Sequence, residues 1–199
     1  LDEIDKVGND YKGDPSSALL EALDPEQNNT FTDHYIEFPI DLSKVLFITT
    51  ANDVSSITAP LYDRMEVIEL NSYTAVEKFH IAKEHLIKKE LAKHALTARE
   101  FKITDDAIDF LIEGYTREAG VRSLEKMIAA LCRKASVALE SGQKSFRVTS
   151  DNIEDILGKK KYSQDKICDE PLVGTVNGLA WTSVGGTILP IEISALEGT

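Results

Sequence analysis

Apolar and polar positions divide the chain into regions of different periodicity, the first of which is residues 1–71. Two short apolar runs, 45–48 and 65–70, are rich in β-branched and aromatic residues. The first predicts a strand buried on both faces, and the second a partly covered strand. Asp14 followed by Pro15 and an apolar run indicates a helix start, with Asp14 as N-cap and Pro15 at the first helical position. This region predicts an α/β unit.

Residues 72–158 have the 3–4 spacing of amphipathic helices. Thr74 and Glu77 form a capping-box pattern before a long first helix, Thr104 caps a second, and Gly120 and Gly142 bracket a third. The apolar positions of the second and third helices are Ile108, Leu111, Ile112, Tyr115, Val121, Leu124, Ile128, Leu131, Ala135 and Leu139. A short strand and a closing helix capped near Ser150 or Asp151 end the region. We expect a small bundle with one apolar interior.

The remaining residues predict a linker and a hairpin. Residues 159–172 are polar, and residues 173–199 hold two β-like runs around Ser183-Val184-Gly185-Gly186. Pro190 predicts an edge strand or a bulge for the second run. The expected division is therefore 1–71, 72–158, 159–172 and 173–199.

Composition narrows the classes of function. The 199 residues carry a net charge of −12, which disfavours nucleic-acid binding through the phosphate backbone. A local basic group is expected to be a solvated helix face; it comprises Lys83, Lys88, Lys89, Lys93, Arg99 and Lys102. No apolar run approaches the roughly 18 residues of a membrane span. Cys132 and Cys168 lack a CxxC spacing, which is typical of reduced thiols, and the four histidines have no metal-ligand spacing.

Five polar residues suit phosphoryl transfer from a nucleotide. Asp2 has the chemistry of a Mg²⁺ ligand, and the neighbouring Glu3 that of a group orienting or deprotonating water. Asn52 ends the predicted strand, where ligands bind in open α/β sheets. Arg64 precedes the next predicted strand, and Arg122 lies in the first turn of the third helix, off its apolar stripe. Each also has an ordinary structural interpretation, and for Arg64 this is a pairing with Asp63 or Glu66.

Longer strings identify a family. "DEIDK", "GDPSSALLEALDPEQN", "DHYIEFPIDLSKVLFITTAN", "APLYDRMEVIEL", "YTREAGVRSLEK" and "GLAWTSVGG" together resemble the Lon family of ATP-dependent serine proteases, which carry an AAA+ ATPase. The resemblance implies an α/β plus α organisation: the C-terminal part of an AAA+ core (1–71), a helical lid (72–158), a linker (159–172) and the first hairpin of an α+β protease domain (173–199).

The resemblance also implies a role for each candidate residue. Asp2 and Glu3 match the Walker B pair, which holds Mg²⁺ and activates water for ATP hydrolysis. Asn52 matches sensor 1, Arg64 the arginine finger that acts on a neighbouring subunit's nucleotide, and Arg122 sensor 2.

One further role and two expected absences complete the resemblance. Tyr11 falls where the second pore loop lies and is expected to touch translocating polypeptide. No GxxxxGK[ST] phosphate loop is present, and the family's Ser-Lys dyad is expected beyond Thr199. Ser16 and Ser17 are expected in a helix start rather than as nucleophiles. The chain is therefore interpreted as a piece that binds nucleotide poorly and cleaves nothing alone.

The whole machine implied is a homo-oligomeric ring, expected to be a hexamer in a bacterial cytoplasm, that unfolds and degrades misfolded, tagged or short-lived proteins. Two alternatives stay open. The first is an AAA+ remodelling ATPase without peptidase, and the second is a non-enzymatic AAA+-like assembly module. A phosphate loop upstream and a catalytic serine and lysine downstream in the reading frame would favour the protease.

Overall fold

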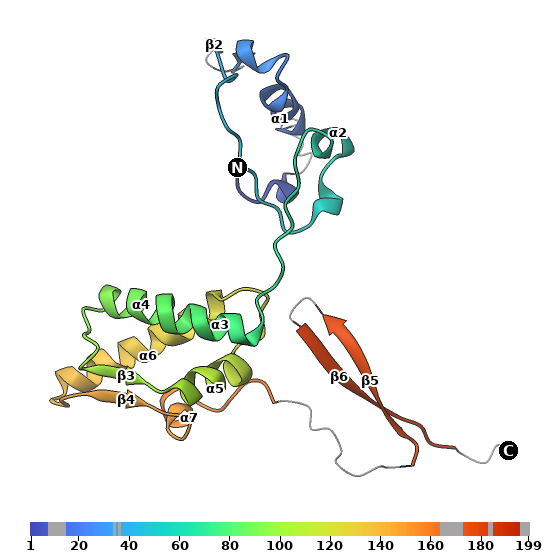
Figure 1. The fold of residues 1–199 in the computed structure, drawn as a ribbon. Helices are drawn as coiled ribbons and strands as arrows, with labels where there is room; N and C mark the ends of the chain where they lie inside the picture. Colours follow the sequence, from blue (N-terminus) through green and yellow to red (C-terminus); the bar gives the residue numbers. More distant parts are fainter. Residues whose placement is uncertain (8–14, 34, 36, 164–172, 183–184, 196–199) are drawn as a thin grey trace. The chain divides into compact units, whose positions relative to one another are not determined.

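The chain forms two units, Leu1–Glu69 and Leu70–Thr199, in a computed structural model (Figure 1). The structure describes residues 1–7, 15–33, 35, 37–163, 173–182 and 185–195. The two units are described separately below.

The first unit consists of short elements joined by long extended segments. Its helices and strands are η1 (Ile4–Lys6), α1 (Pro15–Leu23), η2 (Asn28–Thr30), β1 (Phe31–Thr32), β2 (Pro39–Ile40), η3 (Val54–Ser56) and α2 (Ala59–Tyr62). Helix α1 begins at Pro15, as the sequence predicts, while the expected N-cap Asp14 lies outside the described residues. Helices α1 and α2 are in contact, and each has one buried side chain, Ala22 in α1 and Leu61 in α2.

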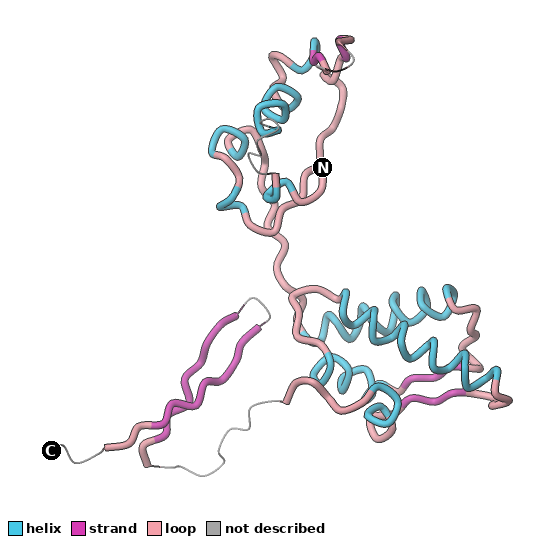
Figure 2. Tube along the Cα trace, turned by 180° about the vertical axis from the view of Figure 1, so that it is seen from behind, coloured by secondary structure: helices cyan, strands magenta, loops and turns pink. Residues whose placement is uncertain are grey.

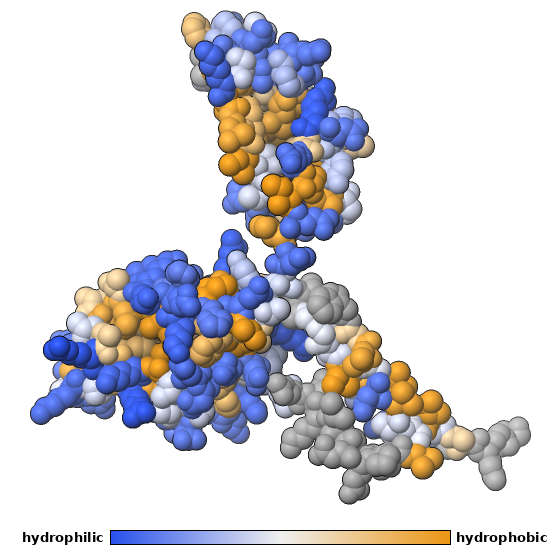
Figure 3. Space-filling model, in the orientation of Figure 1, coloured by the Kyte–Doolittle hydropathy of each residue, from blue (hydrophilic) through white to orange (hydrophobic). Residues whose placement is uncertain are grey.

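The two strands predicted in the first unit are wrong. Residues 45–48 and 65–70 contain no strand, and Leu46 and Ile48 are 83% and 71% exposed instead of buried on both faces. Leu70 is 91% exposed, and apolar surface is visible on this unit in Figure 3. A strand requires hydrogen-bonding neighbours along its length. Among the described residues, segment 45–50 has only a short pairing with residues 1–4.

The second unit begins with a helical bundle that matches the predicted lid. Its elements are α3 (Ala75–Ile81), η4 (Ala82–Leu86), α4 (Ile87–Lys93), β3 (Phe101–Ile103), α5 (Asp105–Tyr115), α6 (Arg122–Glu140), β4 (Phe146–Val148) and α7 (Ile153–Leu157). The capping box at Thr74 and Glu77 is confirmed, since the Thr74 hydroxyl accepts from the Glu77 N–H and the Glu77 carboxylate accepts from the Thr74 N–H. Segment η4 is a π-helical turn that joins α3 to α4 without a break.

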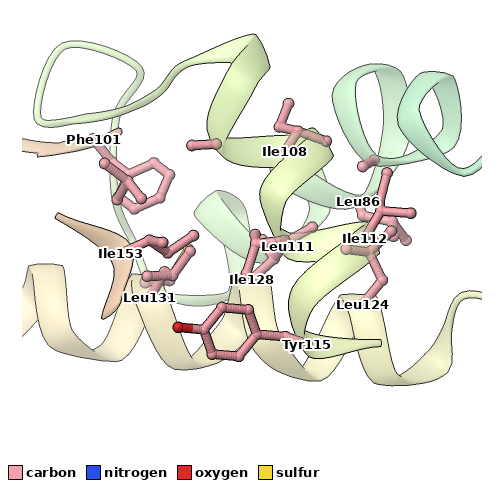
Figure 4. Packing of buried hydrophobic residues seen from close by; sticks show 14 of the residues in the cluster. Leu86, Phe101, Ile108, Leu111, Ile112, Tyr115, Leu124, Ile128, Leu131 and Ile153 are labelled. Carbon is pink, nitrogen blue, oxygen red and sulfur yellow. The ribbon is translucent and has the colours of Figure 1, made fainter. Parts of the chain in front are cut away.

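The core of this unit lies where the apolar spacing predicts it. Leu124, Ile128 and Leu131 of α6 have no exposed surface, and they pack against α5 and α7 (Figure 4). The α5 positions predicted to face the core are all buried: Ile108, Leu111, Ile112 and Tyr115. Gly142, with φ of +96°, follows the Ser141 C-cap of α6, which confirms the predicted helix end.

The sequence predicts one strand in this region, which is β4. The structure adds β3, which pairs with β4 as a parallel ladder. Phe101, Lys102 and Ile103 pair with Phe146, Arg147 and Val148 (Figure 2). Thr104 is the N-cap residue of α5, as predicted, although its hydroxyl makes no capping bond to the helix and donates to the Val148 carbonyl instead.

The N-cap of α7 lies one residue beyond the pair near which the sequence predicts it. Asn152 rather than Ser150 or Asp151 is the N-cap residue. The Ser150 hydroxyl donates to Asp106 at 2.6 Å, and the Asn152 amide oxygen accepts from the Thr149 N–H at 2.8 Å. These bonds complete the turn before α7, so that the helix starts at Ile153.

The predicted hairpin is confirmed as β5 (Thr175–Thr182) paired antiparallel with β6 (Gly185–Glu192). Pro190 lies opposite Asn177 on a strand that has no other described neighbour, which is the edge position predicted for it. Large apolar side chains on this hairpin are exposed, among them Val176, Leu179 and Leu189.

The expected surface and thiol properties of the lid can be checked directly. Lys83, Lys89 and Lys93 are half exposed and ion-paired with acidic neighbours, as expected for a solvated face. Cys132 is a buried free thiol, and Cys168 lies outside the described residues. Within the part of the chain that the structure describes, no helix is both long and apolar enough to cross a membrane.

Candidate functional site

Backbone pairing brings the start of the chain alongside segment 48–50. The Leu1 amino group donates to the Ile48 carbonyl at 2.8 Å, and the Thr50 N–H donates to the Leu1 carbonyl at 2.9 Å. The Ile4 N–H then donates to the Thr50 carbonyl at 2.9 Å. Residues 1–4 and 48–50 therefore run side by side in the same direction, with Asp2 and Glu3 next to the segment that leads to Asn52.

The Thr50 hydroxyl connects this pairing to both acidic residues. Its oxygen accepts from the Glu3 N–H at 3.0 Å, and its proton is donated to the Asp2 carboxylate. Asp2 is exposed, and an exposed carboxylate oriented by a hydroxyl is a donor of the type that Mg²⁺ prefers. The donor set on this chain therefore fits one protein ligand to such an ion.

Glu3 has an uncommon backbone conformation and an ion-paired side chain. Its φ of +53° lies in the left-handed region, which is sparsely populated by residues other than glycine and is found more often at functional sites. Its carboxylate accepts from Lys6 Nζ at 2.6 Å. This hydrogen bond and the Glu3 charge raise the pKa of Lys6. The bond uses only one of the two carboxylate oxygens, Oε2.

Asn52 is exposed and is followed directly by a fixed turn. The Asp53 carboxylate accepts from the Ser55 hydroxyl at 2.7 Å and from the Ser55 N–H at 2.9 Å, and these bonds start η3. The same two bonds lower the pKa of Asp53. Since η3 lies close to η1, the turn keeps Asn52 near the paired segments that carry Asp2 and Glu3.

Arg64 is held by a residue forty positions earlier in the chain. Its Nη2 donates to Asp24 Oδ2 at 2.9 Å and its Nη1 to the Pro60 carbonyl at 3.3 Å. The suggested structural partners, Asp63 and Glu66, are therefore wrong. Sequence reasoning missed Asp24, although the Asp24-Pro25 pair is a turn signal in the "LDPEQN" string.

Arg122 is the first residue of α6, and it is exposed as the sequence predicts. Glu118 caps this helix from outside, since its carboxylate accepts from the Ser123 and Leu124 N–H groups at 2.8 and 2.9 Å. The Glu118 carbonyl in turn accepts from the buried amine of Lys78 in α3. The loop before Arg122 is thus fixed through both the carbonyl and the carboxylate of Glu118. Neither Glu118 nor Lys78 was identified from the sequence.

The candidate residues therefore fall into two groups. Asp2, Glu3, Asn52 and Arg64 belong to the first unit, and Arg122 belongs to the second. Tyr11 lies outside the described residues, and Ser16 and Ser17 lie in the first turn of α1. In the described ranges, no group of three or more His, Cys, Asp or Glu side chains is arranged to hold a metal ion.

Comparison with known proteins identifies the class of each region. Residues 1–73 match the ATPase family associated with various cellular activities, abbreviated AAA. Residues 92–148 match the Lon protease AAA+ ATPase lid domain, and residues 147–199 match the Lon protease (S16) C-terminal proteolytic domain. These matches define an AAA region, a lid and the start of a serine-protease domain, in the order given by the sequence.

Individual relatives agree with these matches. The chain is 52% identical over 200 residues to Lon protease of Desulforamulus reducens, 53% identical over 199 residues to Lon protease of Campylobacter jejuni, and 51% identical over 199 residues to Lon protease 1 of Bacillus subtilis. Each alignment covers 100% of this chain and 25–26% of the relative. The chain belongs to the Lon protease family, and it spans about a quarter of the length of these relatives.

A solved structure is also similar to the chain. This is the Lon protease SSD domain of Bacillus subtilis, which is 43% identical in sequence, with a TM-score of 0.40. The match covers 46% of this chain and 97% of that one.

Proposed function

We propose that this chain is part of an ATP-dependent serine endopeptidase that unfolds, translocates and degrades proteins. The observation that carries the proposal is the pairing of residues 1–4 with segment 48–50, which sets an acidic pair beside the segment ending in Asn52. The family membership of the chain supports the same proposal. ATP and Mg²⁺ are the proposed cofactors.

Within this activity, the acidic pair and the asparagine act on the terminal phosphate and the attacking water. Asp2 is the proposed Mg²⁺ ligand, and the ion, when bound, supplies Lewis-acid neutralisation of phosphate charge. Glu3 orients the water and accepts its proton, and Asn52 holds the water in line. These roles rest on the family pattern and on the juxtaposition of the three residues.

The two arginines supply positive charge. We assign to Arg64 the part of an arginine finger, which stabilises the transition-state charge on the nucleotide of a neighbouring subunit. We assign to Arg122 the sensing of nucleotide state by the lid, from the exposed first turn of α6. Tyr11 is the proposed contact to translocating polypeptide.

The surrounding assembly and its location belong to the same proposal. We propose a homo-oligomeric ring, a hexamer, that acts on misfolded, tagged or short-lived proteins in the cytoplasm during quality control and stress. We also propose the division into an AAA+ core (1–71), a lid (72–158), a linker (159–172) and the start of the protease domain (173–199).

The test uses the full-length protein that carries this chain. We expect Glu3→Gln to abolish ATP turnover and ATP-dependent protein degradation while ATP binding persists, because the water loses its base and the phosphate contacts do not change. Arg64→Ala is expected to lose ATPase activity and retain ATP binding. Glu66→Gln, which removes an exposed carboxylate of the same unit, is the matched control and should behave as wild type. Wild-type turnover in Glu3→Gln would refute the role assigned to Glu3.

A further inference from the structure

The guanidinium of Arg64 is oriented by contacts within its own subunit. Two of its nitrogens have acceptors: Nη2 donates to Asp24 and Nη1 to the Pro60 carbonyl. The Pro60 contact spans four residues and comes from the short helix α2, which ends just before Arg64. The Asp24 contact spans forty residues and is therefore the one that ties the arginine to a separate element.

Asp24 is a rigid anchor for this contact. Its side chain is only 13% exposed, whereas that of Arg64 is 35% exposed. Asp24 Oδ1 accepts from the Glu26 N–H at 3.0 Å, and the Asp24 carbonyl accepts from the Asn28 N–H at 2.8 Å. The carboxylate is thus fixed by the turn that ends α1, and its other oxygen, Oδ2, accepts from Arg64 and, at 3.4 Å, from the Gln27 side-chain amide.

Packing keeps the two ends of the contact in place. Helix α1, which ends one residue before Asp24, lies against α2, which ends two residues before Arg64. Ala22 and Leu61 are buried on these helices. An arginine side chain otherwise has many accessible rotamers. A carboxylate fixed in this way reduces the range of orientations open to the guanidinium while part of it still faces solvent.

We propose that Asp24 is the positioning residue for Arg64, holding the guanidinium extended so that it meets a neighbouring subunit's nucleotide without reorganisation. This inference rests on the proposed function, in which Arg64 is an arginine finger. Asp24 itself contacts neither nucleotide nor water in this scheme. It acts only through Arg64.

Asp24→Asn in the full-length protein separates this role from a general structural one. The amide is isosteric, and its oxygen can still accept from the Glu26 N–H. Its NH2 group then replaces Oδ2 and faces Arg64 with a donor instead of an acceptor. We expect kcat for ATP to fall about 10- to 100-fold, as for other small misplacements of a catalytic group, with KM for ATP and the melting temperature little changed. Asp24→Glu, which retains the carboxylate, should recover most of the lost kcat.

Two further variants complete the design. Glu26→Gln removes a charge from the same turn without touching Arg64 and should leave kcat unchanged. In an Arg64→Ala background, Asp24→Asn should cause no additional loss of kcat, because a positioning residue has nothing left to position. An additional loss in that background would mean that Asp24 acts through the fold, and it would overturn the proposal even if Asp24→Asn alone were poorly folded.

The remaining outcomes distinguish this inference from the proposed function. If Arg64→Ala loses turnover while Asp24→Asn retains it, the positioning role is wrong and the finger assignment stands. If Asp24→Asn increases turnover, Asp24 restrains Arg64 instead of presenting it, and the proposal is again overturned. If Arg64→Ala itself turns over ATP as wild type does, the finger assignment fails and the positioning role fails with it.

Discussion

Replacing Glu118 by alanine should destabilise the lid more than a surface substitution normally does. The Glu118 carboxylate accepts from two backbone N–H groups at the start of α6, at 2.8 and 2.9 Å, and it is only partly exposed. The first N–H groups of a helix have no partner within the helix, so the loss of this carboxylate leaves Ser123 and Leu124 dependent on solvent. Helix α6 is 19 residues long and carries the buried centre of the lid.

The size of the effect follows from these contacts. Loss of one N-terminal capping bond costs about 1 kcal/mol, and Glu118 supplies two such bonds. The negative charge near the helix N-terminus adds about 0.3–1 kcal/mol. Partial exposure moves the sum toward its lower end, so we expect the free energy of unfolding to fall by about 2 kcal/mol. Glu118→Gln retains one acceptor oxygen and should lose about half as much.

Urea unfolding followed by circular dichroism at 222 nm is the appropriate assay, because the lid contains most of the described helical residues. At m-values of about 1–3 kcal/mol/M, a loss of 2 kcal/mol lowers the midpoint by roughly 0.7–2 M. Glu113→Ala, which removes an exposed carboxylate from α5, is the matched control and should shift the midpoint little. A Glu118→Ala midpoint that coincides with this control would refute the view that the carboxylate stabilises α6.

Three other predictions concern the same unit. Leu131→Ala removes a fully buried side chain and should cost about 2–5 kcal/mol of unfolding free energy by the same urea assay. The Ser150 hydroxyl, the Thr104 side chain and the Ser150 N–H lower the pKa of Asp106 to about 2, from 3.8. Stability from this carboxylate is therefore present above pH 3.8 and lost as the pH falls toward 2; Asp106→Asn should flatten thermal stability measured across that range. Burial, with a smaller effect of the Glu90 charge, raises the pKa of Cys132 to about 11. In a Cys168→Ser variant, the Cys132 thiol should therefore resist Ellman's reagent at pH 8 and react only when urea unfolds the lid.

The lid could be predicted well because its structure depends on local periodicity. The apolar residues of α5 and α6 recur every three or four positions, and their burial follows directly from which face of a helix they share. The Thr74–Glu77 capping box is likewise a pattern within four residues. Strands β5 and β6, which pair with each other, are likewise adjacent in the sequence.

The first unit could not be predicted equally well because strands depend on distant neighbours. The run 45–48 has the composition of a buried strand, but burial requires pairing partners that sequence composition cannot supply. The β3–β4 ladder joins residues about 45 positions apart and has no local signal. The bond from the Ser150 hydroxyl to Asp106, 44 positions away in the sequence, has no local signal either.

The candidate site likewise contains residues that the sequence identified and supporting residues that it did not. The family strings pointed to Asp2, Glu3, Asn52, Arg64 and Arg122, and their assigned roles remain proposals. The residues that hold these groups in place were not foreseen: Thr50 beside Asp2, Asp24 beside Arg64, and Glu118 before Arg122. Hydrogen-bond partners such as Asp24 and Arg64 are brought together by helix packing, which no motif records.

The parallel pairing of Phe101–Ile103 with Phe146–Val148 determines when the lid can fold during synthesis. Two strands of this kind cannot meet until the chain between them, including α5 and α6, has been made and has turned back. On the ribosome, the lid would remain open until Val148 leaves the exit tunnel, whereas the β5–β6 hairpin needs only its own adjacent residues. Translation would therefore complete the bundle in one late step, and a nascent chain arrested before Val148 should remain sensitive to protease.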